Sequence, residues 1–171
     1  MGQPTEPTGS HATDIELREV RDEDLEVFWT MSSDPESNHM AAFTSKDPYD
    51  RAAFDAHWAR IRGGEGIVLR TVTDARTGEV LGNLAVHGPA EERSVSYGIV
   101  RSHWGRGLAT AALRALLAAL PERPLHARAA CDNTGSVRVL TRCGFEITGT
   151  ESHWAHAREA DTEEYVFLLR D

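Results

Sequence analysis

The stretch from Val95 to Leu120 most constrains what this chain can fold into, because its hydrophobic period changes at a glycine-rich turn. Val95, Tyr97 and Ile99 place apolar side chains at every second position, which is the period of a strand with one buried face. After the turn, apolar residues recur every three or four positions, as on one face of a helix: Leu108, Ala109, Ala112, Leu113, Leu116, Leu117 and Leu120. The sequence therefore predicts a strand, a tight turn and a helix in direct succession.

The turn at residues 104–107 precedes the N-terminus of that helix and has the composition of a phosphate-binding loop. The first turn of a helix carries unpaired backbone N–H groups and a partial positive charge. Gly105 and Gly107 leave those groups uncovered, Arg106 adds a positive charge, and Thr110 adds a hydroxyl. A P-loop would need a lysine here, and a dinucleotide fingerprint would need a third glycine where Thr110 stands. Both of these phosphate-binding motifs are therefore disfavoured.

The run Trp104-Gly105-Arg106-Gly107-Leu108-Ala109, followed by Thr110, resembles the acetyl-CoA-binding motif [QR]-x-x-G-x-[GA] of the GNAT superfamily of N-acetyltransferases. Trp104 stands where Gln or Arg is usual, as in the form found in the branch that acetylates ribosomal-protein N-termini (alanine or serine). A second block, from Asn133 through Ser136 and Leu140 to Phe145, is similar to that branch's N-x-x-S-x-x-x-L-x-x-x-G-F element. The resemblance covers roughly residues 15–169, although only these two blocks are specific.

The resemblance implies an α/β (mixed α+β) GNAT fold, with a central mixed, largely antiparallel twisted sheet of six to seven strands and helices on both faces. The chain pattern agrees, since strands are expected at 67–73, 80–87 and 93–100 in meander order, and at 15–20, 125–131, 145–150 and 165–169. Helices are expected at 22–31, 50–61, 108–120 and 134–143. Pro35 is expected to end the first helix, and 33–49 to form a loop or short helices beside the acceptor pocket.

Length and composition limit the remaining possibilities. A chain of 171 residues fits one domain, expected over 14–171, after a disordered leader at 1–13. The net charge of −9 opposes binding to nucleic acid, and no apolar run is long enough to cross a membrane. The two cysteines form no C-x-x-C pair and are expected to stay reduced. We expect a cytoplasmic protein, monomer or homodimer, with no nucleic-acid or membrane partner.

The resemblance also implies acetyl-CoA (CoA) as co-substrate, and it assigns contacts residue by residue. The spacing of histidines and carboxylates in the sequence leads us to expect no metal. The pyrophosphate would lie at the turn and the start of its helix, on Gly105, Arg106, Gly107, Ala109 and Thr110. The strand before the turn would splay from its neighbour, so that backbone groups of Ile99 and Val100 bind the pantetheine arm and the thioester carbonyl. Asn133 would contact the same arm, and Ser136 would lie near the sulfur. Asn133 has an equally good interpretation as the cap of its helix, with Asp132 and Thr134 as competitors.

Transfer of an acetyl group to an amine needs a neutral amine and a proton for the departing thiolate. The tyrosine that many GNAT enzymes use as the acid is replaced here by Leu140, which leaves Ser136 or a water. A related branch has a glutamate base on the strand before the turn, and the residues nearest to that position are Ser94 and, in the preceding turn, Glu92. Each candidate base is also explained as an ordinary solvent-exposed residue with no role in the reaction.

The alternative bases are four histidines, whose ordinary pKa lies near 6.5: His39, His87, His153 and His156. His153 and His156, which flank Trp154, would lie after the penultimate strand where such folds often close over the acceptor. No carboxylate completes a convincing metal site with this pair in the sequence.

The leading hypothesis is an acetyl-CoA-dependent N-acetyltransferase that modifies a primary amine, on a peptide or protein N-terminus or on a small molecule, by direct attack in a ternary complex. Because an α-amine is about a tenth neutral at pH 7 and a lysine amine far less, a site without an evident base favours the α-amine. The missing tyrosine also suits a non-catalytic acyl-CoA-binding or sensing module. An acyltransferase that uses a longer acyl-CoA is a third possibility.

Overall fold

The computed structural model describes residues 14–171, so the leader expected at 1–13 lies outside the described residues. One sheet holds seven strands in the order β1-β2-β3-β4-β5-β7-β6. They are β1 (Ile15–Arg18), β2 (Val68–Asp74), β3 (Val80–His87), β4 (Ser94–Ile99), β5 (Leu125–Ala130), β6 (Glu146–Ala155) and β7 (Ala160–Leu169). Only β4 and β5 pair in parallel, and every other neighbouring pair is antiparallel. The expected mixed, largely antiparallel sheet is confirmed.

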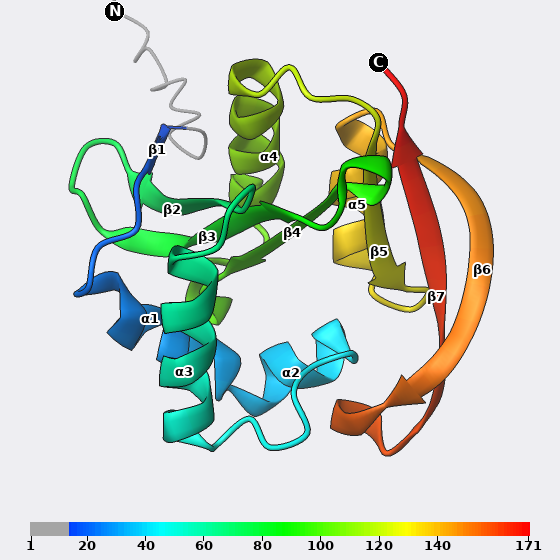
Figure 1. Cartoon of the computed structure of the whole chain (residues 1–171), viewed down its shortest axis with the longest axis horizontal. Helices are drawn as coiled ribbons and strands as arrows, with labels where there is room; N and C mark the ends of the chain where they lie inside the picture. The colour runs from blue at the N-terminus through cyan, green and yellow to red at the C-terminus, as the bar shows by residue number, and fades with distance from the viewer. Residues whose placement is uncertain (1–13) are drawn as a thin grey trace, which may run out of the picture.

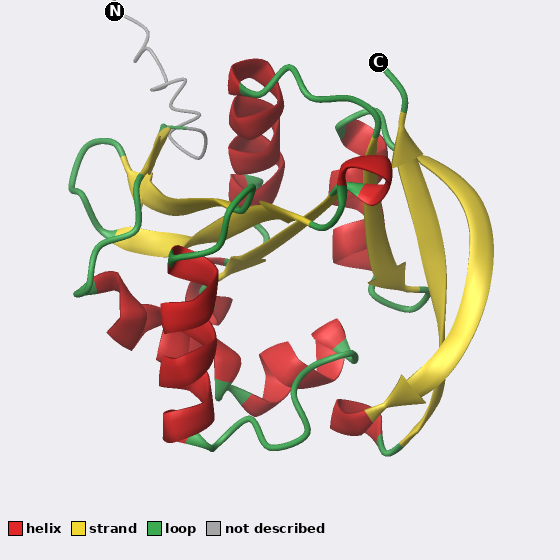
Figure 2. Ribbon diagram, viewed as in Figure 1, coloured by secondary structure: helices red, strands yellow, loops and turns green. Residues whose placement is uncertain are grey.

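Helices cover both faces of this sheet (Figure 1). They are α1 (Asp24–Ser32), α2 (Pro35–Ala41), α3 (Arg51–Arg62), α4 (Leu108–Ala119) and α5 (Thr134–Arg142). Helix α4 crosses one face of β1 to β4, while α1 and α3 lie on the other face (Figure 2). Helix α5 packs beside α4 and β5, and Leu140 on α5 joins the buried core with Leu113 on α4 and Phe167 on β7. Each fully buried leucine in this core contributes about 2 kcal/mol of hydrophobic stabilisation.

The first helix ends at Ser32, close to the expected boundary, but Pro35 begins the next helix instead of ending this one. The α1 helix stops at Ser32, and the Asp34 carboxylate caps α2 by accepting the Ser37 N–H at 3.0 Å. Proline is tolerated at the first position of a helix because the N–H that it lacks would have no intrahelical partner there. Part of the segment 33–49 is therefore helical, which the sequence left open.

The two closing strands are longer than expected. β6 extends to Ala155 and β7 begins at Ala160, so His153 and Trp154 belong to a strand instead of a loop. β6 is an edge strand on which every residue except Ala155 is exposed. An exposed edge strand has no alternation of buried and exposed residues, and the sequence signal for its length is correspondingly weak.

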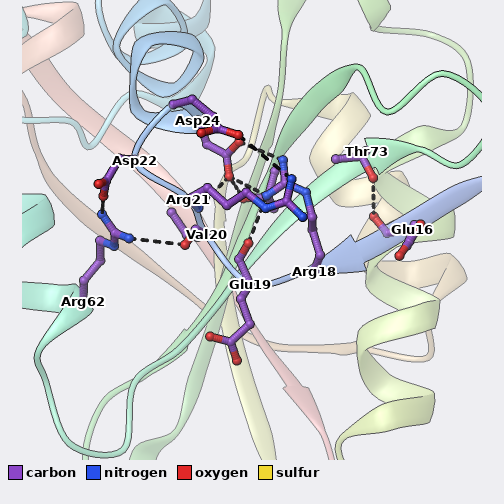
Figure 3. A network of polar contacts seen from close by, with 11 residues as sticks. Glu16, Arg18, Glu19, Val20, Arg21, Asp22, Asp24, Arg62 and Thr73 are labelled. Atoms are coloured by element: carbon purple, nitrogen blue, oxygen red, sulfur yellow. Dashed lines mark hydrogen bonds and ion pairs between the residues drawn. The ribbon is translucent and has the colours of Figure 1, made fainter.

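A buried carboxylate anchors the start of α1 (Figure 3). Asp24 is fully buried and accepts two hydrogen bonds from Arg18, at 2.7 and 2.8 Å. The backbone N–H of Arg21 donates to it at 2.8 Å, and the Thr71 hydroxyl on β2 donates at 2.7 Å. Burial raises the pKa of Asp24, but the hydrogen bonds from Arg18, Arg21 and Thr71 outweigh burial and hold that pKa below its ordinary value. The network fixes α1 against the sheet.

Helix α3 is tied to the same region. Arg62 at its end donates to Asp22 at 2.7 Å and to the Val20 carbonyl at 3.3 Å (Figure 3), and Arg51 at its start donates to Glu26 of α1 at 2.6 Å. The contacts of Arg62 with Asp22 and of Arg51 with Glu26 are exposed ion pairs, each of which contributes little to stability. No helix among residues 14–171 combines the length and apolar character needed to cross a bilayer.

Candidate active site

The sheet opens between its two parallel strands. Within the described residues, β4 and β5 are in register at one position, where Ser94 lies beside His126. From there β4 continues to Ile99 without β5 as a ladder partner. The strands therefore splay toward the C-terminal end of β4, as the resemblance implies.

The register of β4 against β3 decides which backbone groups face this gap. The Val100 N–H donates to the Leu81 carbonyl at 2.8 Å, and the Val100 carbonyl accepts the His103 N–H at 2.9 Å. In an antiparallel ladder alternate residues bond to the partner strand, so Tyr97 and Ile99 direct their backbone groups away from β3 and into the gap. Both backbone groups of Val100 are thus hydrogen-bonded within the fold, whereas those of Ile99 point into the gap.

A cavity of about 970 Å³ passes through the gap and has walls on both faces of the sheet. Its α4 side is formed by Tyr97, Ile99, Trp104, Gly105, Gly107, Leu108, Ala109, Thr110, Asn133, Gly135, Ser136, Arg138, Val139 and Arg142. Its α1 side is formed by Gly98, Ser96 and Asn83 of the sheet together with residues of α1, α2, α3 and the segment between α2 and α3. Two molecules would thus reach the gap from opposite faces.

The glycine turn forms one wall of the α4 side. Gly105 and Gly107 have φ angles of +77° and +74°, in the left-handed region that favours glycine, and a Cβ on either would meet no atom within 4 Å. Gly107 caps α4 without any side-chain hydrogen bond, so no side chain covers the first N–H groups of that helix. Gly105, Gly107, Ala109 and Thr110 all line the cavity, as a phosphate site at this turn requires.

The sequence singles out Arg106 at the turn, but two other arginines line the cavity. Arg106 is exposed, does not line the cavity, and has its guanidinium 3.2 Å from Nδ1 of His103. Arg138 and Arg142, one helical turn apart on α5, do line it. The four-residue spacing of these two arginines within the second motif was the signal that could have found them.

Trp104 fastens the turn to the end of β4. Its indole Nε1 donates to the Ile99 carbonyl at 2.8 Å, while the ring is 41% exposed. The Ile99 carbonyl is therefore already hydrogen-bonded to Trp104. The Ile99 N–H remains free to bind a molecule in the gap.

Asn133 begins α5 and joins the two sides of the cavity. Its Oδ1 accepts the Ser136 N–H at 3.2 Å, so Asn133 is the helix cap. Its Nδ2 donates to the Met40 carbonyl on α2 at 3.1 Å. Its competitor Asp132 instead pairs with Arg158 at 2.5 Å.

Ser136 lines the cavity, and the phenol of Tyr97 lies beside it. The Tyr97 hydroxyl lies 2.7 Å from Oγ of Ser136 and 3.3 Å from its carbonyl oxygen. Burial raises the pKa of Tyr97 to about 12, against the opposing effect of the hydrogen bond to Ser136, so the phenol stays protonated at neutral pH. Leu140 is fully buried in the core, and the phenol near Ser136 comes from β4 instead of α5. From the sequence, Tyr97 is expected only to be one of the apolar residues of this strand.

The candidate bases Glu92 and Ser94 lie elsewhere. Neither lines the cavity, because Glu92 ends a short 3-10 helix and Ser94 begins β4, at the end where β4 and β5 are still paired. The five residue steps from Ser94 to Ile99 span about 17 Å of strand. The structure therefore brings neither residue to the cavity.

His153 and His156 also stay outside the 970 Å³ cavity. His153 lies 3.1 Å from Glu151 and 3.6 Å from Glu164, an arrangement with enough ligand atoms for a cation. The Arg128 guanidinium already donates to both carboxylates, so an arginine occupies the position of a cation.

Residues 14–146 match the family described as the Acetyltransferase (GNAT) domain. The chain belongs to the GNAT acetyltransferase family. Among curated proteins, the uncharacterized N-acetyltransferase p20 of Bacillus licheniformis is 24% identical over 163 residues, which cover 91% of this chain and 92% of that protein.

Solved structures of GNAT proteins share this fold. Spermidine N-acetyltransferase from Vibrio cholerae, in complex with CoA and spermine, has a TM-score of 0.79 at 14% identity, covering 92% of this chain and 95% of that one. Ribosomal-protein-alanine N-acetyltransferase from Brucella melitensis has a TM-score of 0.77 at 18% identity, covering 91% and 99%. At these identities the likeness establishes the architecture of the GNAT fold.

Proposed function

We propose that this protein is an N-acetyltransferase that uses acetyl-CoA and acetylates a primary amine by direct attack in a ternary complex. The observation that carries the proposal is the cavity through the sheet, with an uncovered helix N-terminus on its α4 side and a separate approach on its α1 side. Holding two reactants at attack distance can lower the barrier by about 7 to 11 kcal/mol.

The α4 side fits the co-substrate. The uncovered N–H groups after Gly107 suit a diphosphate, and Arg138 and Arg142 supply the positive charge that phosphates prefer. The Ile99 N–H faces the gap where a pantetheine arm would pair with β4. Asn133 keeps a second hydrogen on Nδ2 that remains available for the same arm.

Each reacting group has a matching residue on this chain. When bound, acetyl-CoA supplies the thioester whose acyl group passes to the amine. The Ile99 N–H would donate to the carbonyl oxygen as it gains negative charge. The Ser136 hydroxyl would give a proton or a hydrogen bond to the departing thiolate, and the protonated phenol of Tyr97 holds that hydroxyl in place at 2.7 Å.

The direct test is release of free CoA thiol when the protein is incubated with acetyl-CoA and a panel of primary amines. We expect release that depends on both the amine and Ser136. Tight CoA binding with no thiol release across the panel would favour the binding or sensing module instead. Faster turnover of hexanoyl-CoA than of acetyl-CoA would assign the protein to longer acyl groups.

A further inference from the structure

We propose that the amine acceptor is a monoamine joined to an apolar or aromatic group, and that polyamines are poor acceptors. This inference rests on the proposed function and concerns the α1 side of the cavity. It has three supports: the composition of the walls, the position of the carboxylates, and the polar groups beside Gly98.

The walls of the α1 side are aromatic and tightly packed. Phe28 of α1 stacks on Trp58 of α3 with ring centroids 4.9 Å apart, and Phe54 lies 6.2 Å from the same indole. Phe28 and Trp58 are 1% and 9% exposed, which makes them fixed parts of the structure. All three rings line the cavity. A ligand on this side would bury apolar surface against the half-buried ring of Phe54, which the two buried rings hold in place.

Met31 extends this apolar surface to the gap. Its Cε lies 2.9 Å from the position that a Cβ on Gly98 would take, so the thioether lies over β4 where the strands separate. A larger residue at position 98 would displace Met31, and glycine there lets the apolar wall approach the strand. The group attached to the amine would therefore contact Met31 directly.

The carboxylates of this side are badly placed for a polyamine. Among the described residues that line it, Asp47 and Asp50 carry the acidic groups, and both are exposed. The Asp47 carboxylate accepts the Tyr49 N–H at 3.0 Å, and that of Asp50 accepts the Ala53 N–H at 3.0 Å. A polyamine carries several ammonium groups, and each costs several kcal/mol to desolvate without a paired carboxylate.

A monoamine avoids this cost because it reacts in its neutral form. Contact with an apolar wall disfavours the ammonium ion and lowers the pKa of the amine, so the wall itself supplies the neutral nucleophile. Asn83 and Ser96, polar residues of the same side, stand on the strands next to Gly98 and can accept hydrogen bonds from the amine N–H groups. In this proposal the ammonium proton passes to water before the attack, and the proton that the nitrogen loses afterwards replaces the one given to the thiolate, so neither Glu92 nor Ser94 is needed as a base.

The experiment compares kcat/KM at saturating acetyl-CoA for three acceptors: 2-phenylethylamine, phenylalanine amide and spermine. We expect both aromatic monoamines to exceed spermine by about tenfold or more. The amide carries an α-amine, so its rank against 2-phenylethylamine separates a peptide-like source from a simple alkylamine. Spermine at equal or higher kcat/KM would overturn this inference and leave the N-acetyltransferase standing, whereas no turnover of any amine would overturn the proposed function itself.

A matched pair of variants tests the wall. Met31→Gln keeps the length of the side chain and makes its end polar, while Met31→Leu keeps it apolar. We expect Met31→Gln to lower kcat/KM for 2-phenylethylamine by about tenfold, and Met31→Leu to stay within about threefold of the parent. CoA affinity measured by calorimetry should be unchanged in both, which verifies folding. Equal activity of the two variants would contradict the inference.

Discussion

The phenolic oxygen of Tyr97 lies 2.7 Å from Oγ of Ser136, which connects strand β4 to the first turn of α5 beside the opening between β4 and β5. The two residues are 39 positions apart in the chain. Ser136 has the hydroxyl that faces the gap, and Tyr97 restrains it. In the reaction that we propose, the pair would supply the proton donor, since Leu140 stands where a tyrosine is usual in the family.

Replacement of Ser136 by Ala removes the group that stabilises the departing thiolate. We expect kcat to fall by about a hundredfold with little change in KM for acetyl-CoA. Thr134→Ala is the matched control, because Thr134 is exposed on the same helical turn and does not line the cavity. Steady-state kinetics would check both, and an undiminished kcat in Ser136→Ala would assign the proton to a water.

Replacement of Tyr97 by Phe tests the restraint on Ser136 and has a signature in alkaline stability. The folded state keeps the phenol protonated up to a pKa of about 12, whereas the unfolded chain releases that proton near 10.0. Unfolding is therefore increasingly favoured as pH rises from 10 toward 12. Urea unfolding between pH 9 and pH 11.5 should show a smaller pH-dependent loss of stability in Tyr97→Phe than in the parent, and equal losses would argue against a perturbed phenol.

Two variants of equal size at position 107 test the proposed phosphate site. Asp and Asn both tolerate the φ of +74° found at Gly107, so they differ chiefly in charge. We expect Gly107→Asp to bind CoA about tenfold or more weakly than Gly107→Asn, because a carboxylate would repel the diphosphate. Calorimetric titration at low and high salt would check this, and the difference should shrink as salt screens the repulsion.

Variants of Glu92 and Ser94, the two bases expected from the sequence, should have little effect on activity. Glu92→Gln and Ser94→Ala alter residues outside the cavity, at the opposite end of β4 from the gap. We expect kcat and its pH profile to stay within about threefold of the parent, the usual effect of surface changes away from a site. A loss of the basic limb of the pH profile in Glu92→Gln would restore Glu92 as a candidate base.

The buried network at Asp24 should dominate acid stability. Its folded pKa lies below the ordinary value of 3.8, so its stabilising effect is complete above that value and is lost as pH falls through the lower folded pKa. Asp24→Asn should cost about 3 kcal/mol or more at pH 7, because it leaves Arg18 without its buried charge partner. Asp22→Asn, at an exposed ion pair, should cost under about 1 kcal/mol. Urea unfolding from pH 2.5 to 7 would measure both.

The sequence by itself determined those features that depend on neighbouring residues. The change of period between Tyr97 and Leu108 specifies a strand followed by a helix, and the glycines between them permit the left-handed turn at Gly107. The cap at Asn133 and the family membership follow from short motifs. Periodicity, capping and turn chemistry act within a few residues, so a linear pattern records them.

Only the tertiary structure decided which of these residues share the cavity. Pairing of Val100 with Leu81 turns its backbone away from the gap, and the register position that β4 and β5 share in the described part of the chain lies at Ser94, outside the cavity. The phenol of Tyr97 meets Ser136 through packing between β4 and α5. Sheet register and helix packing bring together residues far apart in the chain, and no local pattern encodes those distances.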